Sequence, residues 1–264
     1  MSLDVTVGII TWKAKELLRQ LLDSVEACIG EVNYDIIVLD NQSGDGTVEM
    51  IENEYPGVKL IKNKRNEGVA PARNKIFKMA EGRYILILDV DTKILPGAIE
   101  VLVQAMNDHP RAAIGGPKLI YGDGSLQLSC RPFPTLLNII IEGTFLRDWF
   151  PNSRFVKAYT MEDRDHNKIG EVDWMYGACL IIKKECLDAI GLFDEKFFYL
   201  YEDVDLCYRA KKLGYQIIYL PEATVIHFLQ RERKGIFHPR IGSHIKSIFR
   251  YLLKDRYGIL GEGS

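Results

Sequence analysis

The segment Ile85-Leu86-Ile87-Leu88-Asp89-Val90-Asp91-Thr92 decides the fold of this chain. Its four consecutive apolar residues are typical of a strand buried in a sheet, because the run is too short and too β-branched for a helix. Two carboxylates follow at its C-terminal end, and the strand period of two predicts that Asp89 and Asp91 lie on one face. Ligands of open α/β sheets bind outside the carboxyl ends of the strands. We therefore expect both aspartates to reach toward one hard cation.

A simpler interpretation of these two aspartates needs no ligand. One of them could cap the helix that Pro96 introduces, and the other could be solvated. Short acidic motifs are common, so for an isolated Asp-x-Asp pair this simpler interpretation is favoured. The remainder of the chain has to decide between them.

Composition excludes several classes of protein. The chain has 264 residues, 47% of them hydrophobic and 27% charged, which predicts one large globular α/β domain or a core with a small appendage. A net charge of -2 argues against a nucleic-acid partner. No apolar run approaches the length of a membrane span, and no signal peptide is evident. The five cysteines form no CxxC pair and are expected to be reduced, as in a cytoplasmic protein.

Alternating strand and helix patterns fill the first third of the chain. Expected strands are residues 5–10, 35–39, 58–61 and 85–88, with amphipathic helices between them. This order predicts a doubly wound, mostly parallel sheet. No G-x-G-x-x-G sequence is present, so dinucleotide chemistry is not expected.

The second half has a different character. Residues 121–173 show no clear periodicity, and a segment of this length is expected to be functional or mobile. Strands are expected at residues 112–115, 177–182 and 215–220, with a helix at 202–213 that Gly214 ends.

The C-terminal region is basic and amphipathic. Residues 231–256 contain eight Lys or Arg and two acids. Apolar residues at helical spacing follow: Ile245, Ile248, Phe249, Leu252 and Leu253. Such a helix could pack on the preceding domain or dock on anionic lipid.

Five motifs occur in an order that resembles a known family. They are Asp40-Asn41-x-Ser43-x-Asp45-Gly46-Thr47, Asn66-x-Gly68 with Ala72-Arg73-Asn74, Asp89-x-Asp91, Glu202-Asp203-Val204-Asp205 with Arg209, and Gly214-Tyr215 with His227. The chain resembles the family-2 inverting glycosyltransferases of GT-A type fold, and most of all the branch of bacterial rhamnosyltransferases and galactofuranosyltransferases. The resemblance implies a catalytic domain at 4–230, with a Rossmann-like nucleotide-sugar half at 4–95 and an acceptor half at 96–230. Residues 231–264 would form a C-terminal helical extension.

The resemblance implies five donor-binding residues. Thr11 and Asp40 would line the pocket of the nucleotide base, although both could instead be helix caps. Asn66 would hold its loop or be a plain turn residue. Arg73 would face the diphosphate from the start of a helix, and Asp89 would hydrogen-bond the ribose.

The resemblance also implies a metal site. Asp91 would bind a divalent cation that bridges the two phosphates, and His227 would be a second protein ligand. Magnesium or manganese suits carboxylate and phosphate oxygens, and the imidazole favours manganese slightly. A structural histidine after a strand is the alternative for His227.

The acceptor side is implied to carry the base. Asp203 would take the proton of the acceptor hydroxyl, as an inverting transfer requires, and Glu202 would bind acceptor or donor hydroxyls. Capping of the helix would explain one of these acids but not both. Trp174 would pack against a sugar, or else belong to the core.

We therefore predict a metal-dependent inverting glycosyltransferase that moves a sugar from a nucleotide diphosphate sugar to a glycan or lipid-linked acceptor in cell-surface polysaccharide synthesis. The favoured donor is deoxythymidine-diphosphate-rhamnose, with UDP-sugars next. The protein would be cytoplasmic, with peripheral contact to the inner face of the membrane. The alternatives are a non-catalytic nucleotide-sugar-binding protein and a nucleotidyltransferase, although the chain lacks a glycine-rich basic loop after its first strand.

Overall fold

The computed structural model describes residues 3–28, 30–143, 149, 153–197, 200–228 and 241–253. The strands are β1 (Val5–Thr11), β2 (Tyr34–Asp40), β3 (Lys59–Lys62), β4 (Tyr84–Asp89), β5 (Thr92–Ile94), β6 (Ala112–Ile120), β7 (Leu126–Gln127), β8 (Cys130–Arg131), β9 (Gly170–Glu171), β10 (Trp174–Met175), β11 (Cys179–Lys183) and β12 (Gln216–His227). The helices are α1 (Lys15–Cys28), α2 (Thr47–Glu54), α3 (Val69–Met79), α4 (Ala98–Asp108), α5 (Leu136–Gly143), α7 (Arg154–Thr160), α8 (Lys184–Ile190), α9 (Glu202–Lys212) and α10 (Ile241–Tyr251).

Ten strands of the described chain form one mixed sheet, whose main path runs β3-β2-β1-β4-β11-β6-β12-β5. The first four strands of this path are parallel. Strand β11 is antiparallel to both of its neighbours, and β5 is antiparallel to β12. The predicted α/β fold with a mostly parallel, doubly wound half is confirmed.

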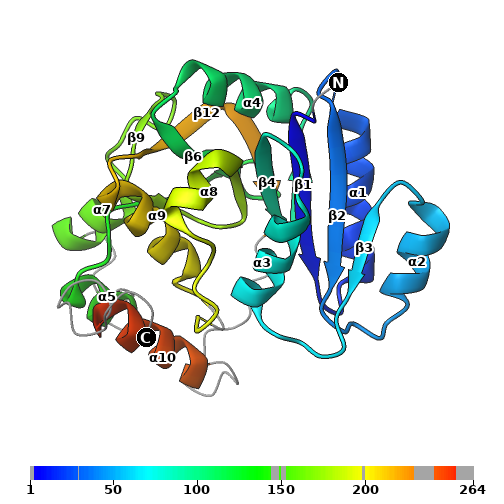
Figure 1. The fold of residues 1–264 in the computed structure, drawn as a ribbon. Coiled ribbons are helices and arrows are strands. Elements are labelled where there is room, and N and C mark those ends of the chain that lie inside the picture. Colours follow the sequence, from blue (N-terminus) through cyan, green and yellow to red (C-terminus); the bar gives the residue numbers. More distant parts are fainter. Residues whose placement is uncertain are drawn as a thin grey trace.

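Helices cover both faces of the sheet and bury two main cores. Apolar side chains of α1, α2 and α4 pack on one face, while α3, α8 and α9 cover the other. Figure 1 shows α1 and α3 on opposite sides of β1 and β2. Strand β4 is buried along its apolar length, as its sequence predicts. It therefore forms the centre from which both halves of the sheet extend.

The chain turns directly after β4, which the sequence analysis did not anticipate. Strand β4 ends at Asp89, residues 90–91 form a turn, and β5 begins at Thr92. Asp91 therefore lies in a turn, and the prediction that strand periodicity aligns the two carboxylates was wrong. Their proximity comes from the turn and from the pairing of β5 with β12.

The segment expected to be irregular contains short elements. Strands β7, β8 and β9 and helices α5 and α7 lie within residues 121–173. Strand β12 is also longer than the expected 215–220, because it passes a register shift between Leu220 and Thr224 and continues to His227. This extension carries the histidine to the edge where β4 ends.

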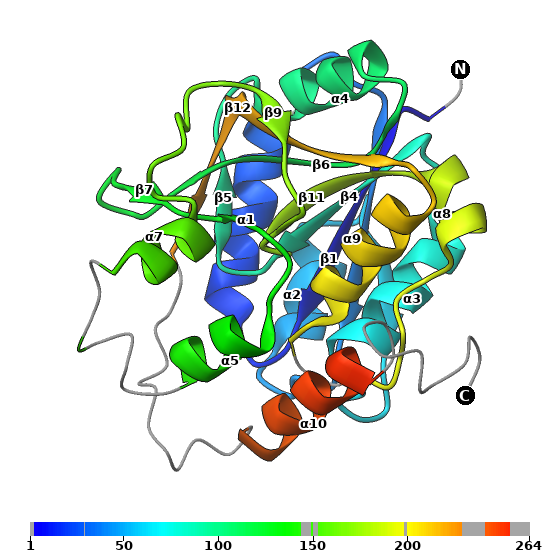
Figure 2. The ribbon, with the colours of Figure 1, turned by 90° about the vertical axis from the view of Figure 1, so that its left-hand side faces the viewer.

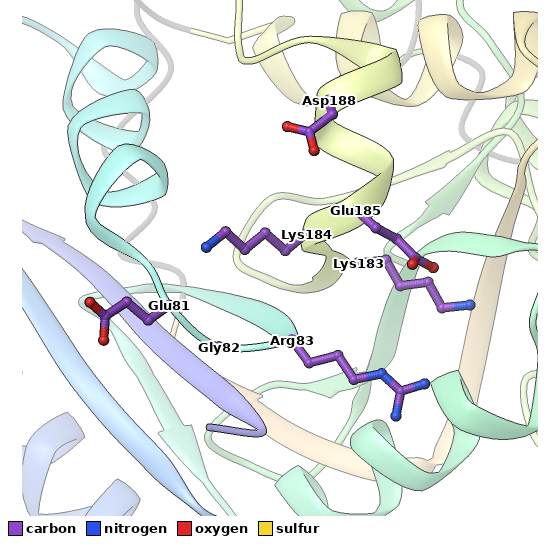
Figure 3. A pocket seen from close by; sticks show the side chains of 7 residues that line it. All are labelled: Glu81, Gly82, Arg83, Lys183, Lys184, Glu185 and Asp188. Carbon is purple, nitrogen blue, oxygen red and sulfur yellow. The ribbon is translucent and has the colours of Figure 1, made fainter. Parts of the chain in front are cut away.

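A cavity of about 300 Å³ lies at the other end of the sheet, away from the aspartates. It is lined by residues 81–83, 183–185 and Asp188, next to the start of β4 (Figure 3). Its lysines are engaged with backbone: the Lys183 ammonium donates to the carbonyl of Pro110 at 2.8 Å, and Lys184 donates to that of Ala80 at 2.6 Å. The mixture of opposite charges favours no class of ligand.

Helix α10 packs on the domain. Tyr251 is 2% exposed and joins the core under α8 and α9, and the Arg250 guanidinium contacts a carboxylate oxygen of Asp194 at 2.6 Å. Figure 2 shows α10 beneath α9 and beside α5. Of the C-terminal extension predicted at 231–264, residues 231–240 and 254–264 lie outside the described residues. Among the helices that the structure describes, none combines the length and apolarity of a bilayer span.

The packing of α10 predicts unequal effects of two aromatic truncations on one helix. Tyr251→Ala should lower the free energy of unfolding by about 2–4 kcal/mol, because it removes a buried ring and leaves a cavity. Phe249→Ala, at a side chain that is 61% exposed, should change it by less than about 0.5 kcal/mol. Urea denaturation measures both, and equal effects would show that α10 is not docked.

Candidate active site

The carboxyl ends of three adjacent parallel strands bring the predicted donor residues to one edge. Thr11 of β1 is the registered partner of Asp40 at the end of β2, and Ile10 is the partner of Asp89 at the end of β4. Parallel strands end at the same side of a sheet, so strand pairing alone brings these side chains together, whatever the conformation of the loops. The sequence patterns that placed them at strand ends located this edge.

Thr11 and Asp40 are both buried at this edge. The Asp40 carboxylate accepts the backbone N–H of Ser43, at 3.2 and 3.3 Å to its two oxygens, and so holds the turn after β2. The Thr11 hydroxyl is buried without a hydrogen-bond partner among the described residues. Such a group has hydrogen-bonding capacity to spare for a ligand. A role for either residue at a nucleotide base remains a prediction.

Asn66 holds its loop through a second asparagine, Asn41, which lies in the first sequence motif but was assigned no role there. The Asn41 amide donates to Asn66 Oδ1 at 2.9 Å and to the Gly68 carbonyl at 3.2 Å. Its oxygen accepts from Asn63 and from the backbone of Glu67. The position of Asn41 directly after Asp40 at a strand end was the available signal. These bonds fix the entry of the chain into α3.

Arg73 is the most interconnected side chain of the site. It is 4% exposed, and its Nη2 donates to Asp89 Oδ1 at 3.0 Å and to the Gly177 carbonyl at 2.8 Å. Its Nη1 lies 3.5 Å from Glu202 Oε1. The guanidinium thus lies among acidic side chains of the protein. If it also faces a diphosphate, as predicted, it would do so while keeping these contacts.

The two acids at the start of α9 meet this network. The Asp203 carboxylate accepts the N–H of Gly177 at 3.1 Å through Oδ2 and that of Val204 at 2.8 Å through Oδ1. Gly177 therefore lies between Asp203 and the Arg73 guanidinium. A β-carbon there would come within 3.0 Å of Arg73 Nη1 and 3.3 Å of Asp203 Oδ2, so only glycine fits without displacing them.

Both acids hold their protons more tightly than free carboxyl groups. Burial, followed by repulsion from Asp203, raises the pKa of Glu202 to about 7, although Arg73 opposes the shift. Burial also raises the pKa of Asp203, while Arg73 and the N–H groups of Val204 and Gly177 oppose it. A carboxylate of raised pKa is a stronger proton acceptor than an ordinary one.

A second cluster contains the predicted metal ligands. Thr92 and His227 are registered partners across β5 and β12, which places His227 Nε2 at 3.4 Å from Asp91 Oδ1. One ligand atom from each of Asp89, Asp91 and His227 lies within 4.8 Å of the others. Two carboxylates with one imidazole suit Mn²⁺ or Mg²⁺, so the donor set fits a divalent cation.

Two further residues, Trp174 on the predicted acceptor side and Gln127 beside the predicted metal ligands, change the description of the site. Trp174 lies in the core with its indole N–H donated to the Pro132 carbonyl at 2.9 Å, which matches the core alternative; contact with a sugar remains a prediction. Gln127, which the sequence analysis missed, contacts His227 from β7. The Asp123-Gly124 turn before it was the signal for a hairpin.

The raised pKa of Glu202 predicts a pH dependence of stability. Between about pH 5 and pH 8 the folded state binds a proton at Glu202 that the unfolded state has released, so wild-type stability should fall as the pH rises. Glu202→Gln removes this term. Its free energy of unfolding relative to wild type should therefore increase over this range, by up to about 3 kcal/mol. Urea titrations at several pH values measure the difference, and parallel curves would contradict it.

Comparison with known proteins identifies the family. Residues 6–182 match the protein family described as "Glycosyl transferase family 2". The chain is 29% identical over 259 residues to the N-acetylglucosaminyl-diphospho-decaprenol L-rhamnosyltransferase of Mycobacterium tuberculosis (strain ATCC 25618 / H37Rv), covering 94% of this chain and 83% of the relative. It is 25% identical over 262 residues to rhamnosyltransferase WbbL of Escherichia coli (strain K12), covering 96% and 94%.

Solved structures share the fold. GalNAc-T7 with UDP, GalNAc and Mn²⁺ superposes with a TM-score of 0.67 at 16% identity, covering 94% of this chain and 48% of that one. Mannosyltransferase PcManGT from Pyrobaculum calidifontis, with GDP-Man and Mn²⁺, superposes with a TM-score of 0.62 at 19% identity, covering 97% and 65%. The predicted resemblance is confirmed. Because the family description matches more than half of the chain, this protein belongs to glycosyl transferase family 2 and is a glycosyltransferase.

Proposed function

We propose that this protein transfers a sugar with anomeric inversion from a nucleotide diphosphate sugar to a lipid-linked glycan acceptor, with a divalent cation held by Asp91 and His227 next to Asp89. The observation that best supports this proposal is a continuous series of side-chain and backbone contacts. Asp89 of the cation group contacts Arg73, Arg73 contacts Gly177, and Gly177 contacts Asp203. The groups that would hold the donor and the base that would activate the acceptor therefore share one edge of the sheet.

The donor side would use the ends of β1, β2 and β4. Thr11 and Asp40 would face the base, and Asp89 would accept from the ribose. Asn66 would act indirectly by holding the loop before α3. Bound between Asp91 and His227, the cation would neutralise charge that develops on the leaving diphosphate. Arg73 would add positive charge behind Asp89 without leaving its buried position.

The acceptor side would supply the base. Asp203 would take the proton of the acceptor hydroxyl as its oxygen bonds to the anomeric carbon, while the bond from that carbon to the diphosphate oxygen breaks on the opposite face. The N–H groups of Gly177 and Val204 fix the orientation of the carboxylate. Because the pKa of Glu202 is raised to about 7, both its protonated and its ionised form would be present near neutral pH. Its carboxyl group would therefore bind a sugar hydroxyl as donor or acceptor of a hydrogen bond.

The chemistry of the relatives supports a choice of substrates. Two relatives that match over most of both chains are named as rhamnosyltransferases, and one of them carries a prenyl diphosphate sugar in its name. We therefore favour deoxythymidine-diphosphate-rhamnose as donor, with UDP-sugars next, and a prenyl-diphosphate-linked sugar as acceptor in cell-surface polysaccharide synthesis. Residues 121–173 would contribute much of the acceptor site.

A non-catalytic sugar-nucleotide-binding protein on this scaffold is less well supported. Such a protein has no need of a half-buried carboxylate whose two oxygens are oriented by backbone N–H groups and whose pKa is raised. Nor does a binding role require Glu202 to be buried next to the carboxyl group of Asp203 at a cost in stability. The alternative of a nucleotidyltransferase is disfavoured by the family membership.

We also propose a peripheral contact with the inner face of the membrane. Lys246 and Phe249 on α10, and Leu253 two residues after its end, are exposed at helical spacing. Helix α5, which carries the exposed Leu136 and Leu137, lies beside it in both views (Figures 1 and 2). Apolar side chains flanked by basic ones suit the headgroup region of an anionic bilayer, where a lipid-linked acceptor would be located.

Substitution of the proposed base tests the function directly. Asp203→Asn should reduce transfer of rhamnose by about 10²–10⁴-fold, because an amide cannot accept the hydroxyl proton. Its affinity for dTDP with Mn²⁺, measured by thermal shift, should stay near that of wild type. Asp188→Asn, at an exposed carboxylate beside the far cavity, is the control and should leave both unchanged. Near-normal transfer by Asp203→Asn would exclude this residue as the base.

The membrane proposal has its own test. Wild-type protein should float with vesicles that contain anionic lipid, and Phe249→Glu with Leu253→Glu should abolish flotation through like-charge repulsion and loss of apolar contact. Leu213→Glu, at an exposed side chain on the end of α9, should float like wild type. Absence of wild-type flotation would remove the membrane proposal and leave the assignment of the reaction untouched.

A further inference from the structure

Gln127 reaches the cation cluster, the group formed by Asp89, Asp91 and His227, from a short hairpin. Strand β7 pairs antiparallel with β6, with Gln127 as the registered partner of Leu119. The turn between them is closed by the N–H of Tyr121 donating to the Ser125 carbonyl at 2.8 Å, and Gly124 takes the left-handed conformation that such a turn requires. The hairpin therefore holds Gln127 on the same sheet as β12, which ends at His227.

The side chains of Gln127 and His227 meet out of contact with solvent. Gln127 Oε1 lies 2.7 Å from His227 Nδ1, and the two residues are 2% and 5% exposed. The other ring nitrogen, Nε2, faces Asp91 at 3.4 Å. The imidazole is thus held between an amide on one side and a carboxylate on the other.

This arrangement has a consequence for the protons of the ring. A neutral imidazole carries one N–H and one lone pair, and an amide oxygen can only accept a hydrogen bond. With Oε1 against Nδ1, the proton belongs on Nδ1 and the lone pair on Nε2, which is the nitrogen that faces Asp91. A cation can be bound only through that lone pair.

We propose that Gln127 is the positioning residue of the cation site, because its amide oxygen keeps His227 in the Nδ1–H tautomer and so sets the divalent-cation affinity of Asp89, Asp91 and His227. The proposal rests on the cation site of the proposed function. It assigns no contact between Gln127 and the cation itself. Gln127 acts only through the orientation and tautomer of the imidazole.

The NH₂ group of the Gln127 side chain supports this assignment. Gln127 Nε2 is buried without a hydrogen-bond partner among the described residues. A buried amide with an unpaired NH₂ group is unfavourable, and an apolar side chain of similar size would avoid the penalty. Glutamine at this position is therefore better explained by what its oxygen does than by packing.

The tautomer can be measured in wild-type protein without any metal. Long-range ¹H–¹⁵N correlation spectra of protein labelled at histidine, recorded where the ring is neutral, distinguish the two nitrogens. The chain has five histidines, so the His227→Asn variant assigns the signal. We expect the Nδ1–H tautomer in wild type, and a mixture or the Nε2–H tautomer in Gln127→Leu. The Nε2–H tautomer in wild type would overturn the proposal.

Cation affinity provides the second measurement. Titration of Mn²⁺ followed by electron paramagnetic resonance should show binding to Gln127→Leu that is about 10–100-fold weaker than to wild type. Gln127→Glu keeps an acceptor for Nδ1–H and should remain within about threefold. Gln104→Leu is the matched control, because that glutamine is exposed on α4 and its amide donates to Asp108.

The outcomes separate this proposal from the proposed function. If wild type binds Mn²⁺ and Gln127→Leu binds it equally well, Gln127 has no positioning role although the cation site stands. If wild type binds no Mn²⁺, the cation site of the proposed function fails, and with it the role of Gln127 in affinity. If Gln127→Leu does not fold, the wild-type tautomer together with the affinity of Gln127→Glu decides the question.

Discussion

The buried guanidinium of Arg73 is the interaction on which the rest of the site depends. It comes from α3 and touches Asp89 at the end of β4, the Gly177 carbonyl before β11, and Glu202 at the start of α9. The carboxyl group of Glu202 is buried beside this guanidinium and would be less tolerable in the interior without it. Removing a partner from a buried charge pair costs about 3–5 kcal/mol, so the network resists piecemeal change. Through it, the end of β4, the residue before β11 and the start of α9 form one connected network.

Strand pairing has the corresponding role on the cation side. The turn at residues 90–91 and the register of β5 with β12 place Asp91 opposite His227, although the two are distant in sequence. The β6–β7 hairpin then places an amide behind the histidine. Backbone hydrogen bonds determine these positions to within a residue, because a slip of one residue turns every side chain to the other face. Strand register therefore determines that Asp91, His227 and Gln127 meet at this edge of the sheet.

Residues 193 and 194, which precede α9, are held from two sides. The Asn74 amide exchanges hydrogen bonds with the backbone of Phe193, each at 2.9 Å, and Arg250 of α10 pairs with Asp194. Leu200 and Tyr201, directly before the two acids, have φ angles of 63° and 71°. Such conformations are unfavourable for residues with side chains and persist only where their surroundings enforce them. Tyr201 lies against Tyr251, with ring centroids 5.4 Å apart, so α10 supports the strained turn that presents Glu202 and Asp203.

The sequence by itself determined the parallel half of the sheet, the edge at which Thr11, Asp40 and Asp89 gather, and the family, because apolar runs, turn residues and ordered motifs are local signals. Only the tertiary structure decided that Arg73 is buried among acids, that Trp174 belongs to the core, and that Asp91 lies in a turn beside His227. It also revealed Gly177 and Gln127 and the role of Asn41, all of which depend on neighbours far away in the chain. Periodicity specifies which face a side chain occupies, whereas the partner it meets there depends on strand register and on the packing of distant segments, which no local pattern contains.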